Sequence, residues 1–430
     1  MQKRIFVAVL FIHVAACAQK TKSNITVADV TRIENVLAAD SMQGRKAGTP
    51  GSEKAAQFIA AEFKKAGLQP LAGDSYLQSF HMLRPKPVSL TGTADGVSLS
   101  PEHLIALSLQ PAIDITETSG YKIAHVKKGE NIYQRINAVL SLKENTIVFL
   151  DSSFAKQFPR LAGFQQLVFE EDTATENTNT IFVLGDLTPQ AFHFQLQQQI
   201  ETITLGNVVG VLPGKTKPDE RVIFSGHYDH LGIGKPQAGD SIYNGANDDA
   251  AGTTAVILLA KQFKQRGNNA RTLVFAAFTA EEIGGFGSQY FSRRLPPENV
   301  VAMFNIEMIG TESKWGRNSA YITGFDKTDM GAILQKSLAG SPFHFYPDPY
   351  PEQQLFYRSD NATLARLGVP AHTISTSKMD SEPNYHQASD EVKTLDLKNM
   401  AAIINAIAAS AQTIVSGKET PTRVKPESLR

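Results

Sequence analysis

The sequence is poor in cysteine, in tryptophan and in net charge. Its 430 residues include one cysteine and one tryptophan, and 42 basic residues balance 42 acidic ones. A single cysteine excludes a disulfide framework and a closed structural zinc site built on thiolates. A chain without net charge has no overall field to hold nucleic acid, so we expect no nucleic-acid partner.

Long apolar runs are missing from the body of the chain. Past the N-terminus no stretch of about eighteen apolar residues occurs, which argues against a membrane-spanning helix there. The chain is 42% apolar and too long for one small core. We therefore expect two compact units, or one large domain that carries an insertion.

The N-terminus has the pattern of a targeting segment. Lys3 and Arg4 precede a short apolar stretch, Ile5–Ala16, and Cys17 follows it. The ending VAAC resembles the bacterial lipoprotein signal, so residues 1–17 are predicted to be a signal peptide whose cysteine receives a lipid. The expected location is then outside the cytoplasm, anchored to a bacterial membrane, with the outer membrane favoured, in the periplasm or on the cell surface. An ordinary secretion signal that happens to contain a cysteine is the alternative.

The remaining chain divides into four segments. Residues 18–84 include an amphipathic helix predicted over Ser52–Lys65, with Ser52 as its cap and Gly67 as its stop. Residues 85–204 carry short β-like runs without a catalytic signature and are predicted to form an inserted β-rich domain. Residues 205–415 are predicted to form the main α/β domain. Residues 416–430 are charged, contain proline and are predicted to be a disordered tail.

Strands and helices alternate along residues 205–415. Strands are predicted over Arg221–Ser225, Thr272–Phe278, Val300–Ile306 and Ala371–Ser375, and helices over Ala250–Arg266, Phe286–Arg293, Met330–Leu338, Asn361–Leu367 and Leu395–Val415. This alternation predicts a three-layer α/β/α fold with a mostly parallel, mixed central sheet. In such sheets, ligand sites gather beyond the carboxyl ends of the strands.

Candidate metal ligands follow the first of these strands. His227 comes at a strand end, and Asp229 stands two residues on, where a carboxylate can orient a ligating imidazole. Asp248 and Asp249 lie in a turn before a helix. Acids at such positions are usually helix caps, although a carboxylate there can also bridge two metal ions.

Acidic and imidazole groups also follow the later strands. Glu281 and Glu282 form a pair in which one member could bind metal while the other handles protons, although such pairs are more often solvated. Glu307 lies in an apolar stretch and needs a partner, because a buried carboxylate is costly alone. His386 precedes Asp390 by four residues. Together these groups favour a catalytic site for zinc or a similar divalent ion.

Five motifs carry a specific resemblance. In order, GHYDHLG, NDDAAG, EEIGGFGS, NIEMIG and YHQASD resemble the motifs of family-28 zinc metallopeptidases. The resemblance covers roughly residues 203–415, and the earlier segment DSMQGRKAGTPGSEKAAQFIAAEFKKAG is similar to the opening of that family. It implies the zinc-exopeptidase fold, in which the inserted segment would correspond to a protease-associated domain. The family includes bacterial aminopeptidases, glutamate carboxypeptidase II and, more distantly, glutaminyl cyclases.

The resemblance also implies a metal centre with two zinc ions per chain. His227 and Glu307 would hold one ion, Glu282 and His386 the other, and Asp248 would bridge them. Many members of the family have aspartate at the position of Glu307. Because the charge and the donor type are unchanged, we expect the site to keep both ions.

Further roles follow from the same resemblance. Glu281 falls on the position of the general base, Asp229 on that of the acidic partner of the first histidine, and Tyr385 on that of a tyrosine that stabilises the oxyanion. Asp249 follows the bridging aspartate, and Asp360 lies in a stretch similar to one near the substrate pocket; neither receives a role.

The expected function is that of an aminopeptidase acting on peptides. Carboxylates around the metal centre would hold a free α-amino group, and a metal-activated water would attack the peptide bond. Carboxypeptidase or dipeptidase action and glutaminyl cyclisation are alternatives on the same fold. An inactive lipoprotein that only binds peptides is an alternative of another class.

Overall fold

A large mixed sheet forms the centre of the molecule. The computed structural model describes residues 24–165, 167–173 and 178–429. The strands follow the order β17 (His344–Pro347), β16 (Ser319–Ile322), β18 (Ala371–Ser375), β15 (Val300–Ile306), β11 (Lys217–His227), β14 (Arg271–Phe278), β10 (Phe192–Leu212), β2 (Leu77–Ala94) and β3 (Val97–Ser98). Three short strands join at the sides: β1 (Gln69–Pro70) and β5 (Ala112–Thr116) pair with β10, and β8 (Val168–Phe169) pairs with β2.

The middle of this sheet is parallel and joins its two flanks through antiparallel pairs, β16 with β18 and β10 with β14. Strand β11 runs parallel to both β14 and β15, and β15 runs parallel to β18. All eight residues of β14 are buried, which explains why this strand reads as an unbroken apolar run. The parallel arrangement brings the carboxyl ends of these four strands to one edge.

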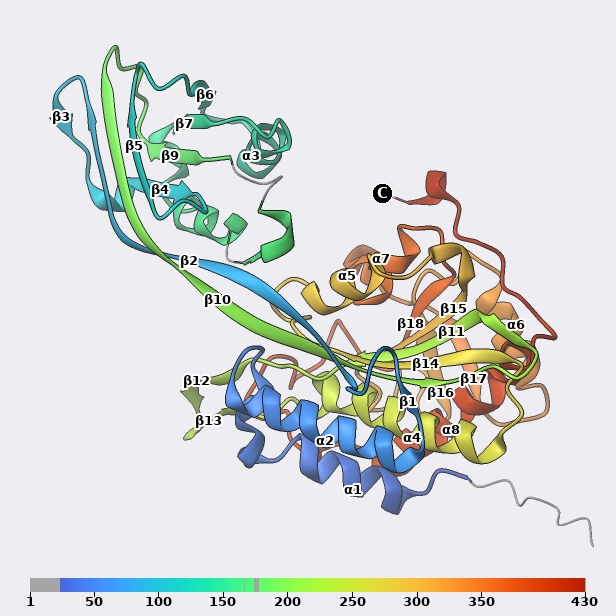
Figure 1. The fold of residues 1–430 in the computed structure, drawn as a ribbon. Helices are drawn as coiled ribbons and strands as arrows, with labels where there is room; N and C mark the ends of the chain where they lie inside the picture. The colour runs from blue at the N-terminus through green and yellow to red at the C-terminus, as the bar shows by residue number, and fades with distance from the viewer. Residues whose placement is uncertain (1–23, 166, 174–177, 430) are drawn as a thin grey trace, which may run out of the picture.

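Helices cover both faces of the sheet. Helices α1 (Val27–Leu37), α2 (Pro50–Ala66), α4 (Ala251–Arg266) and α8 (Leu397–Ser410) lie on one face, while α5 (Phe286–Ser292) and α7 (Asn361–Ala365) lie on the other (Figure 1). Helix α6 (Met330–Ser337) packs beside α8. The three-layer α/β/α arrangement predicted from the sequence is therefore confirmed.

Local signals explain the ends of helix α2. It begins after Thr49, which forms a reciprocal capping box with Ser52, and it ends at Gly67. Gly67 has a φ of 77°, a left-handed conformation that glycine adopts without steric cost. The predicted stop is thus observed, while the cap lies three residues before the predicted one.

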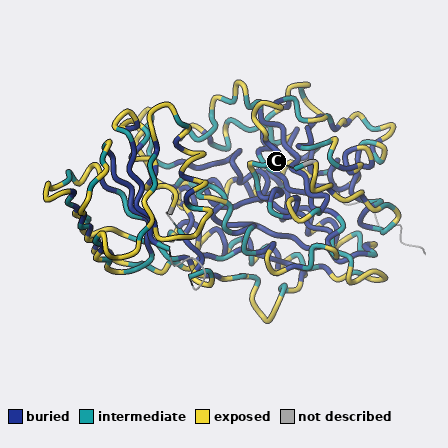
Figure 2. Tube along the Cα trace, turned by 90° about the horizontal axis from the view of Figure 1, so that it is seen from above, coloured by how far each residue is buried: buried dark blue, intermediate teal, exposed yellow. Residues whose placement is uncertain are grey.

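Strands β2 and β10 carry a smaller unit away from the main sheet. They pair antiparallel over most of their length (Figure 1). The smaller unit contains a four-stranded sheet in the order β4 (Leu104–Leu107), β9 (Thr180–Leu184), β7 (Thr146–Leu150) and β6 (Lys122–Val126), together with helix α3 (Ile132–Ser141). The predicted limits at residues 85 and 204 fall inside β2 and β10, so both units share these strands. Figure 2 shows buried residues in the interior of each unit.

Contacts from β8 and the turn after it fasten the smaller unit to helix α5. The Phe169 ring lies 5.6 Å from that of Phe286 in α5, and Arg293, the residue after this helix, lies 4.4 Å from the centre of the Phe169 ring. Arg293 also pairs with Asp172 at 2.7 Å, and Arg294 pairs with Glu171.

The C-terminal segment corrects one prediction. A disordered tail was expected after residue 415, but residues 417–429 lie along the surface of the main unit. Val424 is buried, and Arg423 donates to the carbonyl of Val300 at 2.8 Å. The buried guanidinium of Arg271 donates to the carbonyl of Glu419 at 2.7 Å, and a buried cation needs such acceptors.

Two further predictions concern helices and the N-terminus. The last helix, predicted as one element, is interrupted at Ala411 and continues as α9 (Gln412–Val415). The predicted signal segment and Cys17 lie outside the described residues. Within the described part of the chain, no helix has the length and apolarity needed to cross a bilayer.

Candidate metal centre

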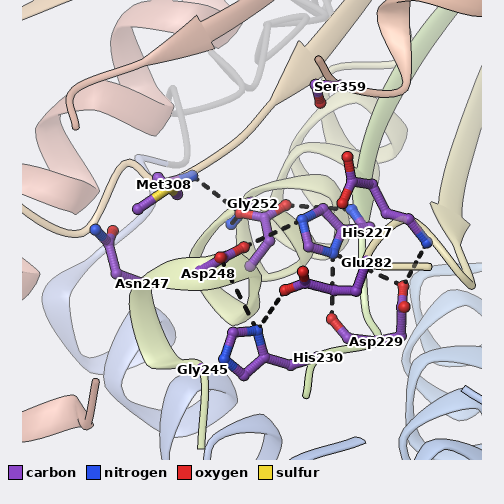
Figure 3. A network of polar contacts seen from close by, with 12 residues as sticks. His227, Asp229, His230, Gly245, Asn247, Asp248, Gly252, Glu282, Met308 and Ser359 are labelled. Carbon is purple, nitrogen blue, oxygen red and sulfur yellow. Dashed lines mark hydrogen bonds and ion pairs between the residues drawn. The ribbon is translucent and has the colours of Figure 1, made fainter. Parts of the chain in front are cut away.

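The predicted ligands gather where the parallel strands end. His227 is the last residue of β11, Glu282 follows β14 by four residues, and Glu307 follows β15 directly. Asp248 stands before helix α4, and His386 lies in the loop after β18. The structure brings all five side chains to one place, part of which is drawn in Figure 3.

The distances between donor atoms are those of ligands that share an ion. Two donors on one tetrahedral zinc, each about 2.0–2.1 Å from it, lie about 3.3 Å apart. His227 Nε2 lies 3.3 Å from Oδ1 of Asp248. His386 Nε2 lies 3.3 Å from Oδ2 of Asp248 and 3.2 Å from Oε2 of Glu282. The two histidines therefore approach different oxygens of one carboxylate.

Unpaired donor atoms support a cation at this place. Nε2 of His227 and Oε2 of Glu307 are buried and have no hydrogen-bond partner among the described residues. Donor atoms of His227, Asp248 and Glu307 all lie within 4.8 Å of one another. Buried polar atoms are costly without partners, and two imidazoles with three carboxylates are a donor set that suits zinc.

Three residues beside the ligands adopt left-handed backbone conformations. Ala280, Met308 and His386 have φ values of 59°, 52° and 57°. Such conformations are unfavourable for residues with a Cβ atom and persist where the surrounding structure holds them, often at functional sites. Here they turn the chain beside Glu281, beside Glu307 and at His386 itself.

Asp249 ties three ligand-bearing segments together. Its carboxylate accepts the backbone N–H groups of His227 at 3.2 Å, Gly252 at 2.9 Å and Met308 at 3.0 Å. These groups belong to the end of β11, the start of α4 and the residue after Glu307. Asp249 thus supports the frame of the metal centre.

Two other buried charges hold the loop that carries Asp248. Asp390 accepts the backbone N–H groups of Asn247 at 2.9 Å and Asp248 at 3.0 Å. Arg45, which is fully buried, donates to four backbone carbonyls, those of Leu37, Tyr228, Asn244 and Gly245. Its guanidinium therefore joins the segments on either side of the site.

Asp229 lies beside His227 and contacts it through both its backbone and its side chain. Nδ1 of His227 lies 3.1 Å from the backbone carbonyl oxygen of Asp229 and 3.8 Å from the nearer carboxylate oxygen. The carboxylate instead accepts the backbone N–H of Glu281 at 3.1 Å. The carbonyl orients the imidazole, and the carboxylate positions the predicted general base.

Glu281 and Tyr385 face the same cavity as the ligands. This cavity has a volume of about 260 Å³. Burial raises the pKa of the Glu281 carboxyl well above its ordinary value, and the neighbouring carboxylates of Glu307 and Asp360 raise it further. The Tyr385 ring stacks on the imidazole of His386, with 3.9 Å between ring centres.

Comparison with known proteins identifies the family. Residues 207–411 match the model of peptidase family M28. The chain belongs to this family. It is 24% identical over 324 residues to a "Probable leucine aminopeptidase" of Trichophyton verrucosum, a match that covers 72% of this chain and 85% of that protein.

Solved structures of similar proteins share the fold of this M28 peptidase. An aminopeptidase from Aneurinibacillus sp. strain AM-1 matches with a TM-score of 0.55 and 16% identity, over 92% of this chain and 95% of that one. A zinc aminopeptidase from Bacillus subtilis matches with the same TM-score and identity, over 94% and 97%. The predicted family and fold are therefore confirmed.

Sequence reasoning missed one residue of the M28 centre, His230. Its Nδ1 lies 2.7 Å from Oε1 of Glu282, while Oε2 of Glu282 faces His386. A separation of 2.7 Å is a hydrogen-bond length and is shorter than the distance expected between two ligands of one zinc, so His230 orients Glu282. The residue stands in the GHYDHLG motif, but only its first histidine and aspartate were interpreted.

The position of the His230 ring also explains why residue 245 is a glycine. Gly245 has a φ of 57°, and a Cβ atom there would lie 2.5 Å from the His230 ring and 2.3 Å from the carbonyl oxygen of Asp248. A larger residue would push the imidazole away from Glu282. Figure 3 shows Gly245 beside this ring.

Proposed function

We propose that this M28 peptidase is a zinc-dependent aminopeptidase that removes residues from the N-terminus of peptides. The observation that carries the proposal is the approach of His227 and His386 to opposite oxygens of Asp248, each at 3.3 Å. The resemblance to a protein named as a leucine aminopeptidase also supports it.

We propose two zinc ions per chain. The first would be held by His227, Glu307 and Oδ1 of Asp248, and the second by His386, Glu282 and Oδ2 of Asp248. When bound, a pair of such ions acidifies a water and polarises the carbonyl of the scissile bond. Glu307 supplies the same donor type as aspartate, which supports occupation of the first position.

The side chains of the protein handle the proton and the charge. Glu281 takes the proton of the attacking water on its carboxylate and delivers it to the leaving amine. The burial that raises its pKa makes this carboxylate a stronger base near neutral pH. The hydroxyl of Tyr385 donates a hydrogen bond to the oxyanion that develops on the former carbonyl.

The cavity has room for one side chain at the N-terminal position. Besides the acidic groups and His386, its lining combines the apolar Met308, Leu355 and Met379 with polar groups, which come from Tyr321, Thr323, Arg358, Ser359, Thr373, Ser375 and Tyr385. A small pocket of this mixed lining suits a single residue, and the apolar part of the lining can contact a side chain such as that of leucine. The carboxylates would hold the free α-amino group of that residue.

A panel of substrates with chelation and metal rescue tests the function. The protein is incubated with peptides that begin with leucine, alanine or glutamine, and with the same peptides blocked at the N-terminus. We expect release of the first residue from free peptides only, loss of release with chelator and its return with zinc. Cleavage of blocked peptides from the C-terminus, cyclisation of N-terminal glutamine, or binding without any turnover would each contradict the proposal.

We also propose that the chain is exported and anchored by a lipid on Cys17, on a bacterial membrane facing the periplasm or the cell surface, with the outer membrane favoured. The charged and apolar residues before this cysteine support the proposal. In a bacterial host, the wild-type chain should be found in the membrane fraction and Cys17→Ala should not. Equal distribution of both proteins would contradict the anchor.

A further inference from the structure

A second cavity lies between the main unit and the smaller unit. It has a volume of about 580 Å³, within the range of sites that bind small ligands. The main unit contributes Ala47 and Ile283 to its lining, β2 contributes Pro85, and the smaller unit contributes Ile105 and Ala106. We call this cavity the inter-unit groove.

Residues that are neighbours in the chain or in backbone pairing line the metal centre and the inter-unit groove. Glu281 and Glu282 line the metal-site cavity, and the next residue, Ile283, lines the groove. Lys46 is a second residue that contacts both places. It lines the groove, and its backbone pairs with that of His230, the residue that orients Glu282. Two separate segments thus join the groove to the metal centre.

The metal-site cavity leaves no room for a whole peptide. Its volume of about 260 Å³ is less than half that of the inter-unit groove. An aminopeptidase places the N-terminal residue at the metals, so the residues after the scissile bond must extend away from them. Resting on the proposed aminopeptidase function, we infer that the inter-unit groove holds these residues, and that the enzyme prefers peptides of several residues to dipeptides.

The chemistry of the groove suits such an occupant. Most of the lining is apolar, which fits the side chains of a peptide. Lys46 adds positive charge, which complements the backbone carbonyl oxygens and the C-terminal carboxylate of a peptide, and Arg84, which also pairs with Glu201 at 3.6 Å, lies in the same lining. Strands β2 and β10, which pair along most of their length, connect the smaller unit to the main sheet, and the ion pair between Arg293 and Asp172 adds a contact between the units.

Filling the groove tests the inference. Ala162 is exposed, lies in the 3₁₀ segment Phe158–Gln165 and lines the groove, so Ala162→Trp should block it without disturbing the core. The matched control is Ala332→Trp, at an exposed position of helix α6, which lies at the opposite end of the molecule (Figure 1). Activity is measured on leucine anilide and on peptides of two, four and six residues that begin with leucine. Binding of a fluorescent hexapeptide is followed by anisotropy.

We expect Ala162→Trp to lower kcat/KM on the hexapeptide, and its binding, by about tenfold or more, which is the scale of lost pocket contacts. The anilide rate should stay within about twofold, and Ala332→Trp should match the wild type throughout. Unchanged hexapeptide kinetics and binding in Ala162→Trp would overturn the groove while leaving the aminopeptidase intact. An equal loss on anilide and hexapeptide would also overturn it. Absence of all turnover in the wild type, with hexapeptide binding still weakened in Ala162→Trp, would overturn the proposed function and leave the groove as a peptide site.

Discussion

Replacing His230 by alanine should weaken one zinc ion selectively. The 2.7 Å hydrogen bond from His230 orients the carboxylate of Glu282, and the side chains of both residues are almost fully buried. A hydrogen bond to a charged group contributes about 1.5–3 kcal/mol. At about 1.4 kcal/mol per factor of ten, its loss should weaken the ion held by Glu282 and His386 about 10- to 150-fold. This range overlaps the cost of about 10- to 100-fold that is typical for partners of metal ligands.

Competition with a fluorescent zinc chelator measures this effect. In His230→Ala, we expect one of two zinc ions to be lost at a lower chelator concentration, while the ion held by His227 and Glu307 keeps its affinity. His230→Asn retains a side-chain N–H donor and should recover part of the loss. His103→Ala, at an exposed position of the smaller unit, is the matched control. If both ions in His230→Ala bind as tightly as in the wild type, the assigned role of His230 is wrong.

Three further changes have defined outcomes. Glu281→Gln should lower turnover by about two to four powers of ten while zinc content stays the same, because an amide cannot accept the proton; unchanged turnover would remove Glu281 from this role. Hydrogen bonds to Asp248 and Glu282 raise the pKa of His386 to about 10 in the metal-free protein. The charged imidazole therefore stabilises the folded protein fully below about pH 6.5, and this contribution is lost as the pH rises through about 10. Calorimetry in chelator should show a falling Tm over this window, and a His386→Ala protein with the same fall would contradict the assignment. Arg45→Lys should cost about 3 kcal/mol in denaturant unfolding, because a lysine cannot serve all four carbonyls of this buried site, whereas Arg317→Lys at the surface should cost little.

The five ligand candidates could be predicted because their positions depend on local pattern. His227, Asp248, Glu282 and Glu307 stand at or shortly after the end of an apolar strand or just before an apolar helix, and parallel strands bring their carboxyl ends to one edge. His386 lies in a loop eleven residues after β18, so only its motif marked it. The motif order then assigned each residue to a family position. The central strands and helix α4 were likewise readable from their buried, continuous or periodic apolar residues.

The supports of the site could not be predicted in the same way. Arg45 and Gly245 are 200 residues apart in the chain, and Asp249 joins segments that meet only after the sheet has formed. His230 contacts Oε1 of Glu282 because Oε2 of the same carboxylate faces His386. This orientation of the side chain cannot be inferred from the sequence. The C-terminal tail looked disordered because its composition is polar, yet the carbonyl of Glu419 and the hydroxyl of Thr420 accept hydrogen bonds from the buried Arg271.

The long strands β2 and β10 were missed for another reason. Their outer parts carry alternating polar and half-buried residues, and β2 contains prolines at 85 and 87, so no single apolar run marks strands of 18 and 21 residues. The two strands form because they pair with each other along most of their length, and this pairing cannot be inferred from either segment alone.

The central claim is that Asp248 bridges two zinc ions, one beside His227 and the other beside His386. Anomalous diffraction at the zinc edge from crystals grown with excess zinc tests it most directly. We predict two zinc peaks per chain, about 3.5–4 Å apart, with one oxygen of Asp248 on each. A single fully occupied zinc peak at saturating metal, or two peaks that do not share Asp248, would contradict the account.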